Sequence, residues 1–147
     1  MPKSVVREVD ALGELVQAAI QMLEATGEFE RGDTRYAAYD GYCARACSAY
    51  KYLIDNDERA RTLAAHPEVA IKYRKDGEKS HYWLLNSQGE VLDLNYARGD
   101  RPPKRYPYHQ GRGASLRRDK KDPRLPARKD SQRIIEVVQA TLGPLVE

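Results

Sequence analysis

Residues 69–96 read VAIKYRKDGEKSHYWLLNSQGEVLDLNY. Apolar and polar side chains alternate over residues 69–74, which predicts a β-strand. The turn signal Lys75-Asp76-Gly77 follows, and residues 81–86 and 90–96 predict a second and a third strand. The chain is therefore expected to contain an antiparallel sheet of at least three strands.

The loop between the second and third strands determines which side chains share a face of the sheet. A three-residue loop over 87–89 favours a left-handed residue at its last position, and Gly89 stands there. In this register His81 lies opposite Asn95, and Asp93 is a diagonal neighbour at a Cβ separation of about 5.5–8 Å. We therefore expect His81, Asp93 and Asn95 to line one face, with Asp93 bonded to His81 and Asn95 as the competing partner.

Helices are predicted before and after this sheet segment. Ser4 can cap a first helix, whose apolar residues recur at intervals of three and four until Gly27 ends it. A second helix follows Gly41, with Cys43 in its first turn, and Ser131 can cap a last helix. The apolar stripe of the second helix consists of Cys43, Ala46, Cys47, Tyr50, Leu53 and Ile54.

These elements predict an α+β fold with N-terminal helices packed on a small antiparallel sheet. The chain has 147 residues, a usual length for a single domain. Within residues 1–147 we expect an N-terminal helix and loop (1–40), a core of Cys helix and sheet (41–97), a loop-rich basic segment (98–130) and a C-terminal helix (131–147). The loop-rich segment is long for an ordinary connection, so it is either a functional loop or contains further strands.

Positive charge is concentrated in one part of the chain. Residues 98–133 hold 13 Lys and Arg against four Asp and Glu, whereas residues 1–97 hold 12 against 16. Such a basic segment either keeps the protein in solution or meets nucleic acid or another anionic surface. The apolar runs are far shorter than the ~20 residues that span a bilayer, and the first residues lack the apolar core of a signal peptide. We therefore expect a cytoplasmic protein without a membrane partner.

Cys43, His81 and Asp93 form the pattern of a thiol nucleophile site. A helix N-terminus favours an anion, and the thiolate is the reactive form of cysteine. A neighbouring histidine accepts and returns the proton, and a carboxylate or amide orients that histidine. Taken singly, Cys43 also fits a small core residue and His81 a packed strand histidine. A thiol on a helix, followed by an imidazole and a carboxylate on two strands, indicates papain-like acyl transfer.

Several short motifs strengthen this interpretation. The segments 41–49, 80–85 and 89–94 resemble the G-x-C-x-x-A, T/S-H-Y/W-W-L and G-x-V-x-D motifs of small phage and bacterial papain-like (NlpC/transglutaminase-like) domains. Residues 107–114 are similar to their Y-x-x-G-R-G segment, and residues 131–135 to the start of their final helix. The resemblance spans about residues 41–138 and implies a papain-like fold.

In that family the matching positions make Cys43 the nucleophile, His81 the base and Asp93 the orienting group. The sequence departs from the family pattern at Ala44, where an aromatic residue is favoured, and at Leu94-Asn95, where Pro-Thr is common. The resemblance implies no particular substrate.

The expected function is that of a thiol-dependent hydrolase or acyltransferase, of the cysteine peptidase or amidase type, acting on an amide or peptide bond. A host protein is one candidate substrate, in the host cytoplasm if the chain is phage-encoded. No cofactor is expected, and two cysteines with three histidines supply a zinc site poorly. The substrate and oxyanion candidates are Tyr39, Asp40, Trp83 and Arg112.

The alternative is a non-catalytic binding protein that uses residues 98–133 to hold nucleic acid or a host protein. The ten tyrosines and the basic segment suit this function, because aromatic rings stack on bases and cations bind phosphates. The reactivity of the Cys43 thiol distinguishes the two hypotheses.

Overall fold

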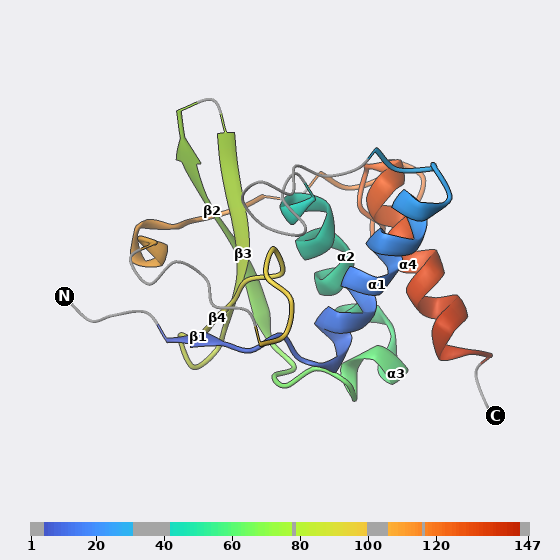
Figure 1. Ribbon diagram of the computed structural model, residues 1–147, viewed down its shortest axis with the longest axis horizontal. Helices are drawn as coiled ribbons and strands as arrows, with labels where there is room; N and C mark the ends of the chain where they lie inside the picture. The colour runs from blue at the N-terminus through green and yellow to red at the C-terminus, as the bar shows by residue number, and fades with distance from the viewer. Residues whose placement is uncertain (1–4, 31–41, 78, 100–105, 116, 145–147) are drawn as a thin grey trace.

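The computed structural model describes residues 5–30, 42–77, 79–99, 106–115 and 117–144. Over these residues the chain is a mixed α+β structure of four α-helices and a five-stranded sheet (Figure 1). The helices are α1 (Ala11–Ala25), α2 (Cys43–Asn56), α3 (Glu58–Arg61) and α4 (Lys129–Leu142). The strands are β1 (Val6–Arg7), β2 (Val69–Asp76), β3 (Lys79–Asn86), β4 (Val91–Leu92) and β5 (Arg112–Gly113), in the order β1-β4-β3-β2-β5.

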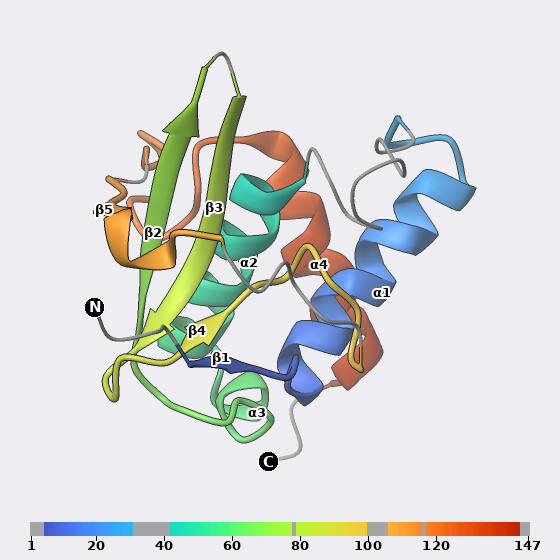
Figure 2. The same ribbon diagram turned by 60° about the vertical axis from the view of Figure 1, so that its left-hand side comes forward.

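Helix α2 lies between the sheet and the other long helices. Figures 1 and 2 show α1 and α4 on the side of α2 that faces away from β2 and β3. The predicted apolar stripe of α2 is buried, and fully burying a large apolar side chain stabilises a fold by about 1.5–3 kcal/mol. This packing fixes the amino end of α2 beside β3. The most buried side chains of the stripe, at 1% exposure or less, are Ala46, Cys47, Tyr50, Leu53 and Ile54.

The predicted register of the second hairpin is confirmed. Leu84 pairs with Leu92, and the backbone N–H of Asn86 donates to Glu90 O at 3.0 Å across a three-residue loop. Gly89 closes this loop with a φ of 78°, the left-handed conformation that glycine adopts at low cost. The Asn86 side chain holds the same loop, because its Oδ1 accepts the backbone N–H groups of Gln88 and Glu90.

The face of the sheet away from α2 carries an aromatic cluster. Trp83 on β3 is fully buried and packs edge-on against the rings of Tyr106 and Tyr108. The 3-10 helix η1 (Tyr108–Gln110) leads into Gly111, where an added Cβ would collide with the Trp83 ring. A glycine is therefore required here for the chain after η1 to lie flat on Trp83.

The third predicted strand is shorter than expected. The interpretation of residues 90–96 as a strand was wrong beyond Leu92, because Asp93 turns the chain. Its Oδ1 accepts the backbone N–H of Asn95 at 3.0 Å, a local bond that competes with the strand ladder. Gln17 on α1 then donates to the carbonyls of Leu94 and Tyr96 at 2.8 and 3.0 Å, which holds the turned segment in place.

The first helix begins later than predicted. It starts at Ala11 rather than near Ser4, which lies outside the described residues, because Asp10 supplies the cap and accepts the Gly13 N–H at 2.8 Å. Val6 and Arg7 instead form β1, which pairs in parallel with β4. Val5, which the apolar pattern assigned to the helix, therefore lies directly before β1.

The segment after residue 98 also differs from expectation. Ser131 does not cap the last helix: α4 begins at Lys129, and Ser131 is buried in its first turn at 1% exposure. The segment expected to be irregular contains η1 and the edge strand β5, which pairs with β2. Within the described ranges of the chain, no helix is both long and apolar enough to cross a bilayer.

Candidate functional site

Cys43 is the first residue of α2, and its side chain faces β3. The thiol is 7% exposed, and Sγ lies 3.8 Å from the backbone carbonyl of Ser80. A helix N-terminus carries about half a positive charge and attracts anions. Cys43 is free, as is Cys47 one turn later, which is completely buried.

His81 and Asp93 lie side by side as the hairpin register requires. His81 Nε2 is 2.7 Å from Asp93 Oδ2, and the carboxylate is fully buried while the imidazole is 16% exposed. The Cys43 side chain lies near enough to contribute to the pKa of His81. The structure thus places the predicted base and carboxylate in direct contact, with the predicted nucleophile beside them.

Asp93 is held from three directions. Besides His81, its Oδ2 accepts the Tyr108 hydroxyl at 2.6 Å, and its Oδ1 accepts the Asn95 N–H. Burial and the nearby carboxylate raise the pKa of Tyr108, so the phenol stays protonated and donates. A buried carboxylate with this many donors has a fixed position, and it therefore fixes the imidazole plane.

Asn95 contacts His81 as well, at the other ring nitrogen. Its Nδ2 lies 3.1 Å from Nδ1, while its Oδ1 is buried with no hydrogen-bond partner among the described residues. Asp93 occupies Nε2, so Nδ1 is the nitrogen left to exchange a proton, and the Asn95 amide lies beside it. Asp93 and Asn95, weighed as competing partners from the sequence, therefore hold opposite nitrogens of the same ring.

The charge state of His81 follows from its partners. Burial lowers the pKa of His81, but hydrogen bonds to Asp93 and Cys43, together with their charges, outweigh it and raise the pKa to about 10. The imidazole is therefore protonated at neutral pH and lies beside the thiol as a cation. Burial, with Cys43 and Asp93 nearby, instead raises the pKa of Cys47 well above its usual range. The two thiols are chemically distinct.

Aromatic rings confine the imidazole on the remaining sides. Its ring centroid is 5.7 Å from that of Trp83 and 5.1 Å from that of Tyr106, which meets it edge-on. Trp83 was a candidate substrate contact, but at 0% exposure it supports the His81 ring from within the protein. Packed aromatic rings restrict the rotamers of His81 and keep water away from its bond to Asp93.

The remaining sequence candidates lie elsewhere. Arg112 is exposed on β5, and β2 separates that strand from β3 in the sheet, so it is not beside the His81–Asp93 pair. Tyr39 and Asp40 lie outside the described residues. Within the residues that the structure describes, no group of three or more His, Cys, Asp and Glu side chains is placed to hold a metal ion.

Two residues of the site were not singled out from the sequence. The Tyr108 hydroxyl donates a hydrogen bond to the carboxylate of Asp93. The sequence feature that could have identified it is the similarity to Y-x-x-G-R-G, because Tyr108 is the first residue of that motif. Gln17 anchors the segment that carries Asp93, and it stands in α1 with 3% exposure. A polar residue on the buried face of an amphipathic helix was the signal for Gln17, because buried amides require partners.

Replacing Tyr108 with phenylalanine is expected to destabilise the fold by about 1.5–3 kcal/mol, since a buried carboxylate loses a hydrogen bond. Urea unfolding measures this change. The matched control is Tyr52→Phe, whose hydroxyl forms no hydrogen bond with another described residue and whose loss should cost less than ~0.5 kcal/mol. Equal costs for the two variants would show that the Tyr108–Asp93 bond contributes nothing.

Comparison with known proteins gives no assignment: no family model, no curated protein and no solved structure matches this chain. The candidate function therefore rests on the geometry around Cys43 and His81.

Proposed function

We propose that the protein is a thiol-dependent hydrolase or acyltransferase that acts on an amide or peptide bond through Cys43, His81 and Asp93. The observation that carries the proposal is the His81 imidazole, which bonds Asp93 at 2.7 Å, lies near the Cys43 side chain and has a pKa raised to about 10. An imidazolium beside a thiol at a helix N-terminus is the arrangement that activates a cysteine nucleophile. The helix-on-sheet placement of these groups also supports a papain-like fold.

The reaction would proceed in two stages. The Cys43 thiolate attacks the carbonyl carbon, and the C=O electron pair moves to oxygen as the tetrahedral intermediate forms. His81 then gives its proton to the departing nitrogen as the C–N bond breaks, which leaves an acyl-thioester on Cys43. Water or another acceptor loses a proton to His81 and attacks the thioester, and the C–S bond then breaks to release the acyl product and restore the thiolate and the protonated imidazole. Asp93 keeps the imidazole oriented throughout and changes no bond.

The first turn of α2 can stabilise the developing oxyanion. The first helical hydrogen bond runs from the Ala46 N–H to the Tyr42 carbonyl, so the N–H groups of Cys43, Ala44 and Arg45 precede the helical ladder. Backbone N–H groups aimed at a developing negative charge typically lower a reaction barrier by about 2.7–4 kcal/mol. The Cys43 N–H is the natural donor because it is on the attacking residue itself.

Selective alkylation tests the proposal. With less than one equivalent of iodoacetamide at neutral pH, we expect Cys43 to react at least ~10-fold faster than Cys47, because Cys47 is completely buried and its pKa is raised. Peptide mapping by mass spectrometry measures both rates. A screen of amide and peptide substrates should then show turnover that Cys43→Ala abolishes and Cys47→Ala retains.

If Cys43 does not react with iodoacetamide and no amide or peptide substrate is turned over, the enzyme proposal is overturned. The binding function would then be favoured, because Lys120, Lys121 and Arg124 are exposed on the loop that the Arg118–Pro126 bridge closes. Such binding to nucleic acid would weaken steeply with salt, since phosphate contacts release counterions.

A further inference from the structure

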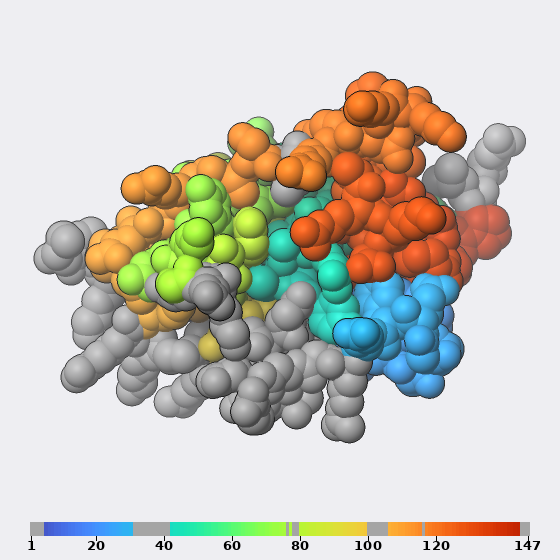
Figure 3. Space-filling model, turned by 90° about the horizontal axis from the view of Figure 1, so that it is seen from above, coloured from blue at the N-terminus to red at the C-terminus, as the bar shows by residue number. Residues whose placement is uncertain are grey.

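A cavity of about 470 Å³ lies next to the proposed nucleophile. Ala44, which follows Cys43, and Tyr82, which follows His81, both line it. Figure 3 shows α2 (teal), the β2–β3 hairpin (green) and the orange segment before α4 gathered on one face of the molecule. The cavity therefore adjoins the amino end of α2, where Cys43 stands, although the Cys43 and His81 side chains are not among the residues that line it.

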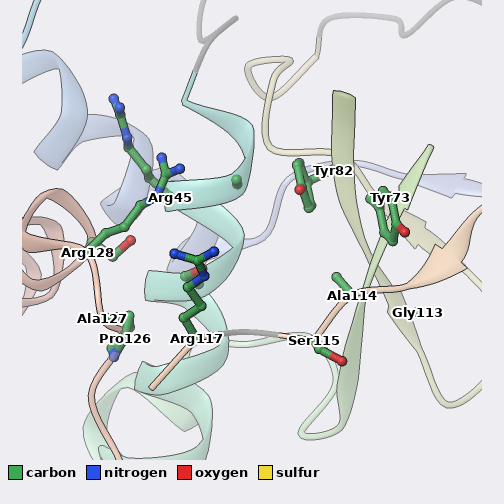
Figure 4. Close-up of a pocket in the computed structure, with 13 residues that line it drawn as sticks. Arg45, Tyr73, Tyr82, Gly113, Ala114, Ser115, Arg117, Pro126, Ala127 and Arg128 are labelled. Atoms are coloured by element: carbon green, nitrogen blue, oxygen red, sulfur yellow. The ribbon is translucent and has the colours of Figure 1, made fainter. Parts of the chain in front are cut away.

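One wall of the cavity is aromatic. Tyr73 on β2 and Tyr82 on β3 pair directly in the sheet register, and their rings stack with centroids 5.6 Å apart and planes inclined by 24°. Figure 4 shows these two side chains on the sheet side of the cavity. A flat group can extend this stack, because aromatic rings attract one another beyond the effect of burial.

The opposite wall is cationic. Arg45, Arg117 and Arg128 line the cavity on the helix side, across from the two tyrosines (Figure 4). Arg45 has a carboxylate partner, since its Nε lies 3.1 Å from Asp130 Oδ2. Within the described parts of the chain, neither Arg117 nor Arg128 forms an ion pair with an acidic side chain. Two guanidinium groups are thus left to bind an anion, and their planar forks match a carboxylate or phosphate.

We propose that this cavity selects substrates in which a planar group bearing a carboxylate or phosphate lies beside the reactive carbonyl. The planar group would stack on Tyr73 and Tyr82, and the anion would bind Arg117 and Arg128. This inference rests on the proposed function for the role of Cys43, but the cavity binds its ligand whether or not the thiol reacts. In this proposal two arginines of the basic segment, Arg117 and Arg128, bind the anionic group of the substrate.

A series of aryl iodoacetamides tests this selectivity at Cys43. The four probes are iodoacetanilide and its para-carboxylate, para-phosphonate and para-trimethylammonium derivatives. The rate at which each probe alkylates Cys43 is divided by the rate at which the same probe alkylates free N-acetylcysteine. We expect the carboxylate or the phosphonate to react about 10-fold faster than the neutral probe and the cation more slowly, and the faster anion identifies the preferred group. Equal normalised rates for all four probes would overturn the proposal.

Charge reversal assigns the effect to the cavity. The double variant Arg117→Glu/Arg128→Glu should bring the ratio of anionic to neutral rates to about 1 or below, with each rate divided by the same variant's rate with plain iodoacetamide. Lys120→Glu/Lys121→Glu makes the same change in net charge on residues of the same loop that do not line the cavity, and it should keep most of the preference. An equal loss in both double variants would mean that general charge, and not the cavity, attracts the anion.

Binding measured without the thiol separates the two proposals. Calorimetry of 4-acetamidobenzoate and 4-acetamidophenylphosphonate, the unreactive analogues of the probes, is carried out with Cys43→Ala. We expect at least one of them to bind, and Arg117→Glu/Arg128→Glu in the same background to weaken that binding at least 10-fold. Binding together with an inert Cys43 would retain the cavity and reject the enzyme. An active Cys43 with no binding of either analogue would reject the cavity proposal alone.

Discussion

Replacing His81 with alanine is expected to slow the alkylation of Cys43 by about 100-fold at pH 6.5. His81 is protonated at that pH because its pKa is raised to about 10, so it places a positive charge beside the sulfur that attacks the reagent. An ordinary cysteine thiol is only about 1% ionised at pH 6.5. The measurement is the second-order rate with iodoacetamide across pH 5–9, and the variant should lose most of its reactivity at the acidic end. Turnover of any amide substrate should fall with it.

Two further variants make this result interpretable. His81→Ala leaves the buried carboxylate of Asp93 without its imidazole, so His81→Gln, which can still donate a hydrogen bond to it, is measured in parallel. His109→Ala removes an exposed histidine and should leave the rate unchanged. If His81→Gln folds and alkylates as fast as the original protein at pH 6.5, the imidazolium does not activate Cys43.

The free energy of unfolding is expected to decrease as the pH rises from about 6.5 to 10. A histidine whose pKa is higher in the folded state binds its proton more tightly there, so its contribution is complete below the unfolded pKa of 6.5 and is lost through the folded pKa of about 10. At ~1.36 kcal/mol per pKa unit this contribution is roughly 4–5 kcal/mol.

Urea unfolding at intervals of pH measures this effect. Other groups also titrate above pH 9, so the relevant quantity is the difference between the original protein and His81→Gln. That difference should shrink by several kcal/mol from pH 6 to pH 10 if the Asp93–His81 ion pair stabilises the fold. Parallel curves for the two proteins would show that His81 has a similar pKa in the folded and unfolded chains.

The sequence was informative for the second hairpin and for the buried face of α2, where local rules predicted the structure, whereas the local capping rule failed at Ser131. Gly89 set the hairpin register, because a three-residue loop favours a left-handed residue at its end, and that register placed His81 beside Asp93. The spacing of apolar residues located Cys43 on the buried face of α2. The geometry around the thiol could therefore be derived from short-range patterns and one turn.

Features that depend on distant residues could not be derived. The turn at Asp93 is held by Gln17, which is 77 residues from Leu94, and a two-residue strand such as β1 has no periodicity to detect. The cavity wall at Arg117 and Arg128 follows from the pairing of β5 with β2. Strand β5 has only two residues, so it shows no periodicity in the sequence. Tertiary contacts determine these parts, and a single sequence does not display them.

The contacts that hold Cys43, His81 and Asp93 in place can form only late in folding. Gln17, Cys43, Ser80 and Tyr108 come from four separate parts of the chain, and contacts between distant residues form slowly because long loops must close first. A chain emerging from the ribosome cannot complete the site until Tyr108 has been synthesised. Cys43 should therefore remain an ordinary thiol during synthesis, and the moment at which it becomes easily alkylated would mark the completion of folding.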